Sequence, residues 1–168
     1  MKRLILIRHA KSDWDDPFNG DHNRRLNARG HRAAGVVGAW LAEQGYLPDH
    51  VQCSTATRCM ETWQEIKQAA NLDLSPEFIK GIYHASSDVM LKILNRAEGD
   101  TVMMLGHNPG ISDFAERLIK GSPPDHEKFY QYPTASVTIL DFDAEDWAYV
   151  NFGEGKLVEF VVPKDLET

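Results

Sequence analysis

The stretch from Arg3 to Lys11, which reads RLILIRHAK, decides the fold. Its Leu and Ile residues lack period-2 alternation and predict a strand at Arg3–Ile7 that is covered on both faces, as in a parallel sheet between helical layers. The apolar pattern stops at Arg8 and His9, so polar groups follow a buried strand directly. The polar segment from Ser12 to Leu26 is expected to form a surface loop near the end of that strand.

Strands alternate with helices along the next hundred residues, as judged from apolar periodicity and capping residues. This alternation predicts a parallel sheet with helices on both faces. The predicted elements are a helix from Asn27 to about Gly45, a strand at Val51–Ser54, a helix over Cys59–Ala70, a strand at Phe78–Ile79, a helix after Ser86 or Ser87 that Gly99 ends, a strand at Thr101–Leu105, and a helix with Asn108 as N-cap and Pro109 at its first position.

The last third of the chain lacks helical signals. Ser136–Phe142, Trp147–Phe152 and Lys156–Val162 predict strands, which we expect to add in antiparallel orientation to one edge of the sheet. The predicted fold class is therefore α/β: a three-layer α/β/α sandwich whose central sheet is mostly parallel, with antiparallel C-terminal edge strands. The length of 168 residues, without repeats or linkers, predicts one domain over residues 1–168.

Composition excludes several classes of protein. With 42% hydrophobic and 26% charged residues, the chain is typical of globular proteins. No apolar run approaches the roughly 20 residues of a membrane helix, and the one at the start stops at Arg8, too early for a signal peptide. We therefore expect no membrane partner and a cytoplasmic location. Cys53 and Cys59 lack metal-ligand spacing and are expected to be reduced, buried apolar residues.

Charge is distributed unevenly along the chain. Residues 1–58 carry 9 Lys and Arg against 6 Asp and Glu, whereas residues 59–168 carry 9 against 19, which gives the total of −7. A net negative charge opposes nonspecific binding of nucleic acid, so no nucleic-acid partner is expected. The arginines near the start of an acidic chain favour a local anion-binding pocket instead.

Imidazoles and guanidinium groups follow three predicted strands. Arg8 and His9 end the first strand, Arg58 opens the helix after the second, and His107 follows the strand at 101–105. Because the carboxyl ends of parallel strands form the ligand-binding edge of such sheets, these side chains are expected to converge. Guanidinium forks match phosphate oxygens, and imidazole acts as nucleophile, acid or base near neutral pH. The sequence therefore predicts a phosphoryl site, to which the helix after Asn108 would add backbone N–H donors.

This set of motifs resembles the histidine phosphatase superfamily, also called phosphoglycerate mutase-like, and within it the small SixA-type phosphohistidine phosphatases. The resemblance covers residues 1 to about 140. The matching stretches are Arg8-His9-Ala10, Lys11-Ser12, Asp21 with Arg24-Arg25-Leu26 and Gly30, Ser54-Thr55-Ala56-Thr57-Arg58 with Glu61-Thr62, Tyr83-His84-Ala85, and Gly106-His107-Asn108.

The resemblance implies roles for individual residues. His9 would be the nucleophile and would form a phosphohistidine intermediate that water hydrolyses. The catalytic residues Arg8, Arg58 and His107 would surround the phosphoryl oxygens. No metal and no cofactor are expected. The residues expected to bind substrate are Lys11, Ser12, Arg25 and Asn108.

The sequence departs from the wider superfamily in two places. Ala10 stands where most members carry glycine, a change common in the SixA-like branch. The glutamate that larger members supply before the third helix as general acid is absent, and only His84 and Asp88 are candidates there. An alkyl phosphate needs such an acid, whereas a phosphorus–nitrogen bond can release an amine already protonated by solvent. The missing glutamate therefore favours phosphohistidine on a phosphorylated protein, with a small phosphorylated substrate of a phosphomonoesterase as the alternative.

Two other classes remain open. A metal-dependent hydrolase would use His9, His84, His107 and nearby Asp residues as ligands, although a dication would be repelled by the arginines. A non-catalytic phosphate-binding module would keep the pocket without turnover. Aromatic residues near the rim of the site could add a recognition surface. The candidates for that surface are Trp14, Phe18 and Trp147.

Overall fold

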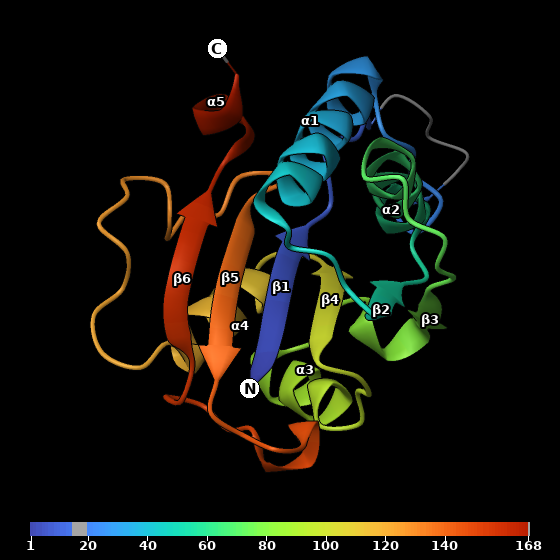
Figure 1. The fold of residues 1–168 in the computed structure, drawn as a ribbon. Coiled ribbons are helices and arrows are strands. Elements are labelled where there is room, and N and C mark those ends of the chain that lie inside the picture. The colour runs from blue at the N-terminus through green and yellow to red at the C-terminus, as the bar shows by residue number, and fades with distance from the viewer. Residues whose placement is uncertain (15–19, 168) are drawn as a thin grey trace.

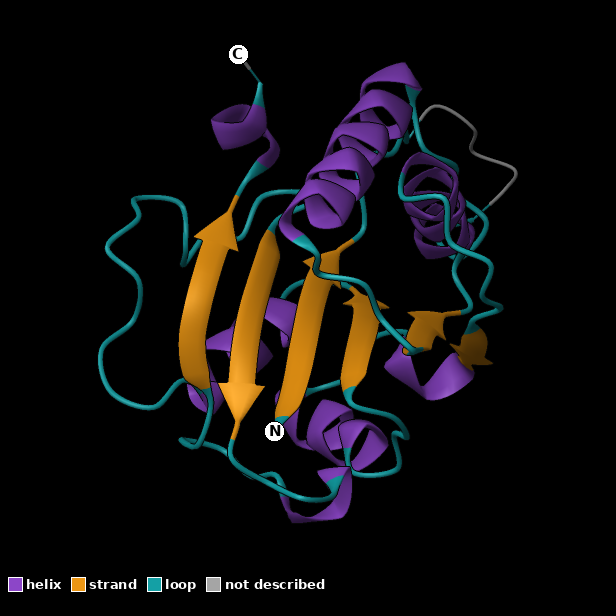
Figure 2. Cartoon of the chain, viewed as in Figure 1, coloured by secondary structure: helices purple, strands orange, loops and turns teal. Residues whose placement is uncertain are grey.

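A computed structural model describes residues 1–14 and 20–167 and shows one six-stranded sheet with helices on both faces (Figures 1 and 2). The strands lie in the order β3-β2-β4-β1-β5-β6. The elements are β1 (Lys2–Arg8), α1 (Ala28–Gln44), β2 (His50–Ser54), α2 (Thr57–Ala69), β3 (Glu77–Ile79), α3 (Ser87–Leu94), β4 (Thr101–Gly106), α4 (Gly110–Leu118), β5 (Val137–Phe142), β6 (Lys156–Val161) and α5 (Pro163–Leu166), with short 3-10 turns at Lys80–Ile82 and Trp147–Tyr149.

The sheet is parallel on one side of β1 and antiparallel on the other. β1 pairs in parallel with β4, β4 with β2 and β2 with β3. β5 pairs with β1, and β6 with β5, in antiparallel orientation. The predicted α/β fold class, with antiparallel C-terminal edge strands, is confirmed. The register sets Arg8 at the end of β1 opposite Gly106 at the end of β4.

The apolar residues of β1 pack into two separate cores, one on each face of the sheet. Leu4 and Leu6 face a core under α3 and α4, whereas Ile5 and Ile7 face a second core under α1 and α2. All four side chains are fully buried. Alternate residues of a strand point to opposite faces, so only a strand covered on both sides can bury every residue of such a run.

Helix α1 begins and ends as its sequence predicts. The side chain of Asn27 accepts a hydrogen bond from the Gly30 backbone N–H at 2.8 Å, and Gly45 ends the helix with a φ of 77°. A Cβ at Gly30 would collide with the Lys11 carbonyl oxygen, which also accepts from the Asn27 backbone N–H. The first turn of α1 therefore packs directly on the loop that follows β1.

Asn108 does not cap α4, contrary to its predicted role. Pro109 takes the N-cap position without a side-chain hydrogen bond, while Asn108 Nδ2 donates to the carbonyl oxygens of Gln131 and Tyr132, each at 3.1 Å. The polar side chain therefore ties down a distant loop. Helix α3 ends at Leu94, short of the predicted Gly99.

The predicted strand at Trp147–Phe152 is wrong, because this segment contains a 3-10 turn at Trp147–Tyr149. Trp147 is 1% exposed, and its Nε1–H donates to the Gly99 carbonyl oxygen at 2.8 Å. The apolar residues of this segment thus cover the core at the end of the sheet instead of adding a strand. Trp147 takes no part in a recognition surface. Phe18 lies outside the described residues, and Trp14 is 73% exposed.

Both cysteines are free and fully buried, as predicted. Burial raises the pKa of Cys59 to about 12, so this thiol stays protonated. Among the helices of residues 1–14 and 20–167, none combines the length and apolar character needed to cross a bilayer.

The contact of α1 with α2 depends on Gly38. A Cβ at this position would lie 2.8 Å from Ile66 Cα and 2.9 Å from Ala69 Cβ, whereas a Cβ at Gly35 of the same helix would meet nothing within 4 Å. We expect Gly38→Ala to lower the free energy of unfolding, because overpacking costs about 1–3 kcal/mol and the gain in helix propensity is at most about 1 kcal/mol. Gly35→Ala should raise it by about 0.5–1 kcal/mol. Urea unfolding of both variants tests this, and shifts of the same sign would contradict the assigned contact.

Candidate active site

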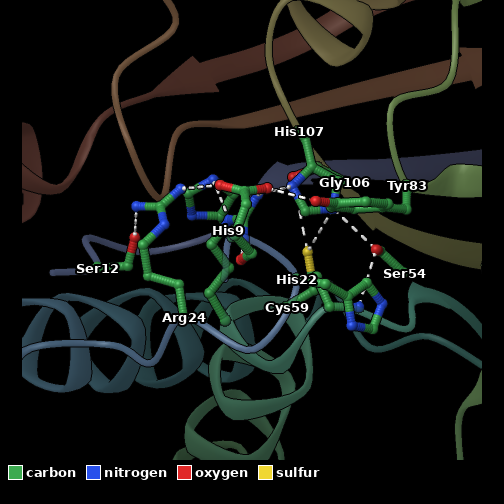
Figure 3. A network of polar contacts seen from close by, with 12 residues as sticks. His9, Ser12, His22, Arg24, Ser54, Cys59, Tyr83, Gly106 and His107 are labelled. Atoms are coloured by element: carbon green, nitrogen blue, oxygen red, sulfur yellow. Dashed lines mark hydrogen bonds and ion pairs between the residues drawn. The ribbon is translucent and has the colours of Figure 1, made fainter. Parts of the chain in front are cut away.

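Four side chains from three elements converge on one cavity of about 490 Å³ at the carboxyl ends of β1 and β4. Arg8 ends β1 and His9 follows it, Arg58 lies in the first turn of α2, and His107 follows β4. The ring centroids of His9 and His107 are 5.3 Å apart (Figure 3). The convergence expected from the sequence is therefore present.

His9 is 5% exposed and presents a neutral nitrogen to the cavity. Its Nδ1 lies 2.7 Å from the Ala10 carbonyl oxygen; because a carbonyl only accepts, Nδ1 carries the hydrogen and Nε2 keeps its lone pair. Arg58 Nε donates to that Nε2 at 3.3 Å. Burial holds the pKa of His9 well below its usual value, aided by the charges of Arg58 and Arg8 and opposed by the bond to Ala10. An unprotonated Nε2 is what a nucleophile requires.

His107 has the opposite tautomer. Arg58 Nη2 donates to His107 Nδ1 at 3.2 Å, so Nε2 carries the hydrogen and donates to Ser54 Oγ at 2.8 Å. Burial, followed by the charge of Arg58, lowers the pKa of His107 to about 3. Without a bound anion His107 is therefore neutral at physiological pH. A nearby phosphate would raise its pKa, because an opposite charge favours the protonated form.

Arg8 and Arg58 are held by backbone carbonyls. Arg8 Nη1 donates to the Tyr132 carbonyl oxygen at 3.0 Å, and Arg58 Nη1 donates to that of Asp21 at 2.6 Å. Burial and the charges of Arg58 and Arg24 lower the pKa of Arg8. The Nε atoms of Arg8 and Arg24 are buried and have no hydrogen-bond partner among the described residues. Buried cations with unsatisfied donors are costly in free energy, and the positive charge of the arginines in the cavity favours a bound anion.

Two side chains of α2 fasten the loops around the cavity. Thr62 Oγ1 accepts from the Ala10 backbone N–H at 2.9 Å and donates to the Arg58 carbonyl oxygen at 2.6 Å. Glu61 Oε1 accepts from the Leu26 backbone N–H at 2.9 Å. The loop after β1 is therefore joined to the helix that carries Arg58, which fixes the position of Arg58 relative to His9.

The residues predicted to bind substrate divide into two groups. Lys11, Ser12 and Asn108 line the cavity. Arg25 is exposed and does not line it, so its role in binding substrate stays a prediction; Arg24 lines the cavity. Arg24 Nη1 donates to Ser12 Oγ (Figure 3). A loop without regular periodicity does not reveal which of two adjacent arginines points inward.

Of the two general-acid candidates, only His84 lines the cavity. Its ring lies against that of Tyr83 with 3.9 Å between centroids. Asp88 does not line the cavity: it is exposed and forms an ion pair with Arg117 at 3.2 Å. The structure therefore does not bring Asp88, which lies in the first turn of α3, to the cavity.

Asp21 and Tyr83 lie in stretches that match the family, but no site role was predicted for either; the structure brings both to the site. Asp21 lines the cavity and accepts hydrogen bonds from Tyr83, Arg24 and Arg58. Burial tends to raise the pKa of Asp21, but the bond from Tyr83 and the arginines outweigh it and hold that pKa well below its usual range. The available signal was the position of Asp21 three residues ahead of Arg24 in the matching stretch.

No group of three or more His, Cys, Asp or Glu side chains in residues 1–14 and 20–167 is arranged to hold a metal ion. His9, His84 and His107 thus do not form a ligand set with the described Asp residues. The arginines that share the cavity with them would also repel a dication.

Comparisons with known proteins agree with this geometry. The model of the histidine phosphatase superfamily (branch 1) matches residues 4–82. An uncharacterized protein of Mycobacterium tuberculosis is 35% identical over 94% of this chain and all of its own length. The crystal structure of the putative phosphohistidine phosphatase SixA from Agrobacterium tumefaciens is 28% identical, with a TM-score of 0.79 over 96% of this chain and 98% of its own. The structure of the putative SixA from Nakamurella multipartitia is 26% identical, with a TM-score of 0.79 over 96% of each chain.

The chain belongs to the histidine phosphatase superfamily, in its SixA-like branch. It is accordingly a hydrolase of phosphorylated substrates that uses a histidine nucleophile and requires no metal.

The low pKa values of His9 and His107 predict a pH dependence of stability. An unfolded histidine takes up a proton near pH 6.5, whereas folded His107 does so only at about 3. Between pH 7 and 5 the unfolded chain therefore binds more protons, and the free energy of unfolding should fall as the pH falls. Urea unfolding at pH 7, 6 and 5 measures this slope. His107→Asn should give a shallower slope than the wild type, and an equal slope would contradict the assigned burial of a neutral His107.

Proposed function

We propose that this protein hydrolyses phosphohistidine, or a similarly labile phosphoryl group, on a phosphorylated protein. The observation that carries the proposal is that an unprotonated His9 Nε2 shares one cavity with the guanidinium groups of Arg8, Arg24 and Arg58. A neutral nucleophile in an electropositive pocket suits attack on a dianionic phosphoryl group.

In the proposed first step, His9 Nε2 attacks phosphorus in line with the departing nitrogen. The P–N bond to the leaving group breaks as the bond to His9 forms, and the leaving imidazole takes its proton from solvent. Water then attacks the phosphohistidine intermediate and releases inorganic phosphate. The Ala10 carbonyl, which accepts from His9 Nδ1–H, holds the ring in the required tautomer and stabilises the charge that develops on it.

Arg8, Arg58 and His107 are proposed to surround the equatorial oxygens. Phosphoryl transfer depends mostly on positioning and on stabilising charge, which buried guanidinium groups provide well. His107 is neutral before substrate arrives and would gain a proton as the dianion raises its pKa. Lys11, Ser12 and Arg24 lie at the cavity wall, where they would contact the phosphoryl group or the substrate around it. Asn108 Nδ2 is already engaged by backbone carbonyls, which leaves its Oδ1 to accept a hydrogen bond.

The substrate class follows from the leaving group. Asp21 is held ionised by its partners and the glutamate of larger family members is absent, which leaves His84 as the acid candidate for an alkoxide among the described lining residues. A phosphorus–nitrogen bond requires less help, because the leaving amine can be protonated by solvent. The exposure of Lys11, Trp14 and His84 at the cavity supports access by a folded protein. A cytoplasmic setting would agree with two reduced cysteines.

Trapping of the intermediate tests the nucleophile. Rapid quenching with a labelled phosphohistidine protein should capture phosphate on the wild type and none on His9→Ala, because no other side chain replaces Nε2. His31→Ala, which alters a histidine of α1 away from the cavity, should trap as much label as the wild type. Absence of label on the wild type with any donor would favour a non-catalytic phosphate-binding module.

His84 favours the second candidate function, a small-molecule phosphomonoesterase, because of the two predicted general-acid residues it is the one that lines the cavity. The variant His84→Asn suits the positive φ of 61° at this position, which asparagine tolerates. If His84 protonates leaving oxygens, this change should lower kcat for sugar phosphates by about 100-fold. Under our proposal kcat for a phosphohistidine protein stays within about 3-fold of the wild type, since solvent supplies the proton. A wild-type kcat/KM more than about 10-fold higher for sugar phosphates would overturn the proposed substrate.

A further inference from the structure

Asp21 makes more hydrogen bonds to the cavity's cations than any role assigned above explains. Its Oδ2 accepts from Arg58 Nη2 at 3.1 Å and from the Tyr83 hydroxyl, and its Oδ1 accepts from Arg24 Nη2 at 3.1 Å. Its backbone carbonyl oxygen accepts from Arg58 Nη1 at 2.6 Å. One residue thus holds two arginines of the same cavity.

These bonds determine where the Arg58 guanidinium lies. With Nη1 and Nη2 bound to Asp21, Nε points at His9 Nε2 at 3.3 Å, and Nη2 also reaches His107 Nδ1 at 3.2 Å. Arg58 is 4% exposed, so it has little freedom to adopt another position. The hydrogen bonds to Asp21 therefore fix the orientation of the Arg58 guanidinium plane between the two imidazoles.

Arg24 is held in a similar way. Besides Asp21 it donates to Ser12 Oγ, and its guanidinium lies 3.6 Å from the centroid of the Trp14 ring. This geometry leaves Nε as the donor without a partner among the described residues. Arg8, Arg24 and Arg58 share one cavity and repel one another, and the Asp21 carboxylate lies between two of them.

We propose that Asp21 is a positioning residue that aligns Arg58 and Arg24 for phosphoryl transfer, with Tyr83 holding its carboxylate in place. The inference rests on the proposed function, because alignment matters only if His9 and Arg58 act on a phosphoryl group. Asp21 does not touch the reacting atoms in this role. It opposes the mutual repulsion of the arginines and keeps their donors directed at the cavity. Residues that hydrogen-bond to catalytic groups from behind orient active sites in the same way in other proteins.

The test compares Asp21→Asn with Asp13→Asn in steady-state turnover of p-nitrophenyl phosphate, together with competitive inhibition by inorganic phosphate. Both variants remove one carboxylate from the same part of the chain, but Asp13 is exposed and accepts only from Asn27 Nδ2 among the described residues. Asp21→Asn should lower kcat by about 10-fold or more, since it loosens a group that stabilises the transition state. Its inhibition constant for phosphate should stay equal or fall, because the cavity becomes more positive. Asp13→Asn should leave both parameters within about 2-fold.

Two further variants separate positioning from folding. Asp21→Glu should recover part of the lost kcat, because the charge is retained, and Tyr83→Phe should give a smaller loss than Asp21→Asn, because it removes one hydrogen bond and no charge. A purely structural role would lower kcat and phosphate affinity together, along with the melting temperature, in all three Asp21 and Tyr83 variants.

The outcomes distinguish this inference from the proposed function. If the wild type forms the labelled intermediate on His9 but Asp21→Asn keeps its kcat within about 2-fold, or loses phosphate binding in proportion, the positioning role is overturned and the phosphatase stands. If the wild type neither turns over p-nitrophenyl phosphate nor traps label, both are overturned.

Discussion

Arg58 is a cation buried almost completely between two imidazoles, and the arrangement of the site depends on the hydrogen bonds and the opposite charge that stabilise it. Removing a guanidinium from water costs several kcal/mol unless hydrogen bonds and an opposite charge replace the solvent. Asp21 supplies the charge, and His9 and His107 supply ring nitrogens that must be unprotonated to accept. One buried group therefore fixes the tautomer of both histidines. The same positive charge lowers the pKa of each ring.

The sheet makes this arrangement possible. β1 and β4 are parallel neighbours with Arg8 opposite Gly106, so the residues that follow the two strands leave the sheet at the same edge. α2 then lies near that edge, and Thr62 ties it to the loop after β1. Apolar residues on both faces of the sheet hold these ends rigidly, because the two cores bury every side chain of the β1 run. The positions of the site residues therefore depend on packing on both faces of the sheet.

The electrostatic balance of the cavity favours a bound anion. The cavity collects arginines whose buried donors lack partners, and it retains only one carboxylate among the described lining residues, Asp21, which is already fully engaged. A dianionic phosphoryl group would complement this charge. A cation or a neutral ligand would leave the positive charge of the arginines uncompensated. The proposed preference for a leaving group that solvent can protonate rests on the absence of the glutamate of larger family members.

The fold and the four central residues could be predicted because local patterns determine them. The unbroken apolar run at residues 4–7, followed by Arg8 and His9, predicts the buried strand that the structure shows, and Asn27 and Gly45 predict the observed start and end of α1. Periodicity, capping and strand ends involve neighbours along the chain, and the rule that parallel strands share a functional edge extends them to His107.

The sequence by itself therefore determined the three-layer sandwich, the order of its elements, and the arginines and histidines that follow the strands. Only the tertiary structure decided that Arg24 rather than Arg25 faces the cavity, that Asp88 pairs with Arg117, that Asn108 binds a distant loop, and that Trp147 fills the core. The physical reason is that a loop has no periodicity to orient its side chains. In such segments the partner of each polar group is a residue far away in the chain, and only packing brings the two together.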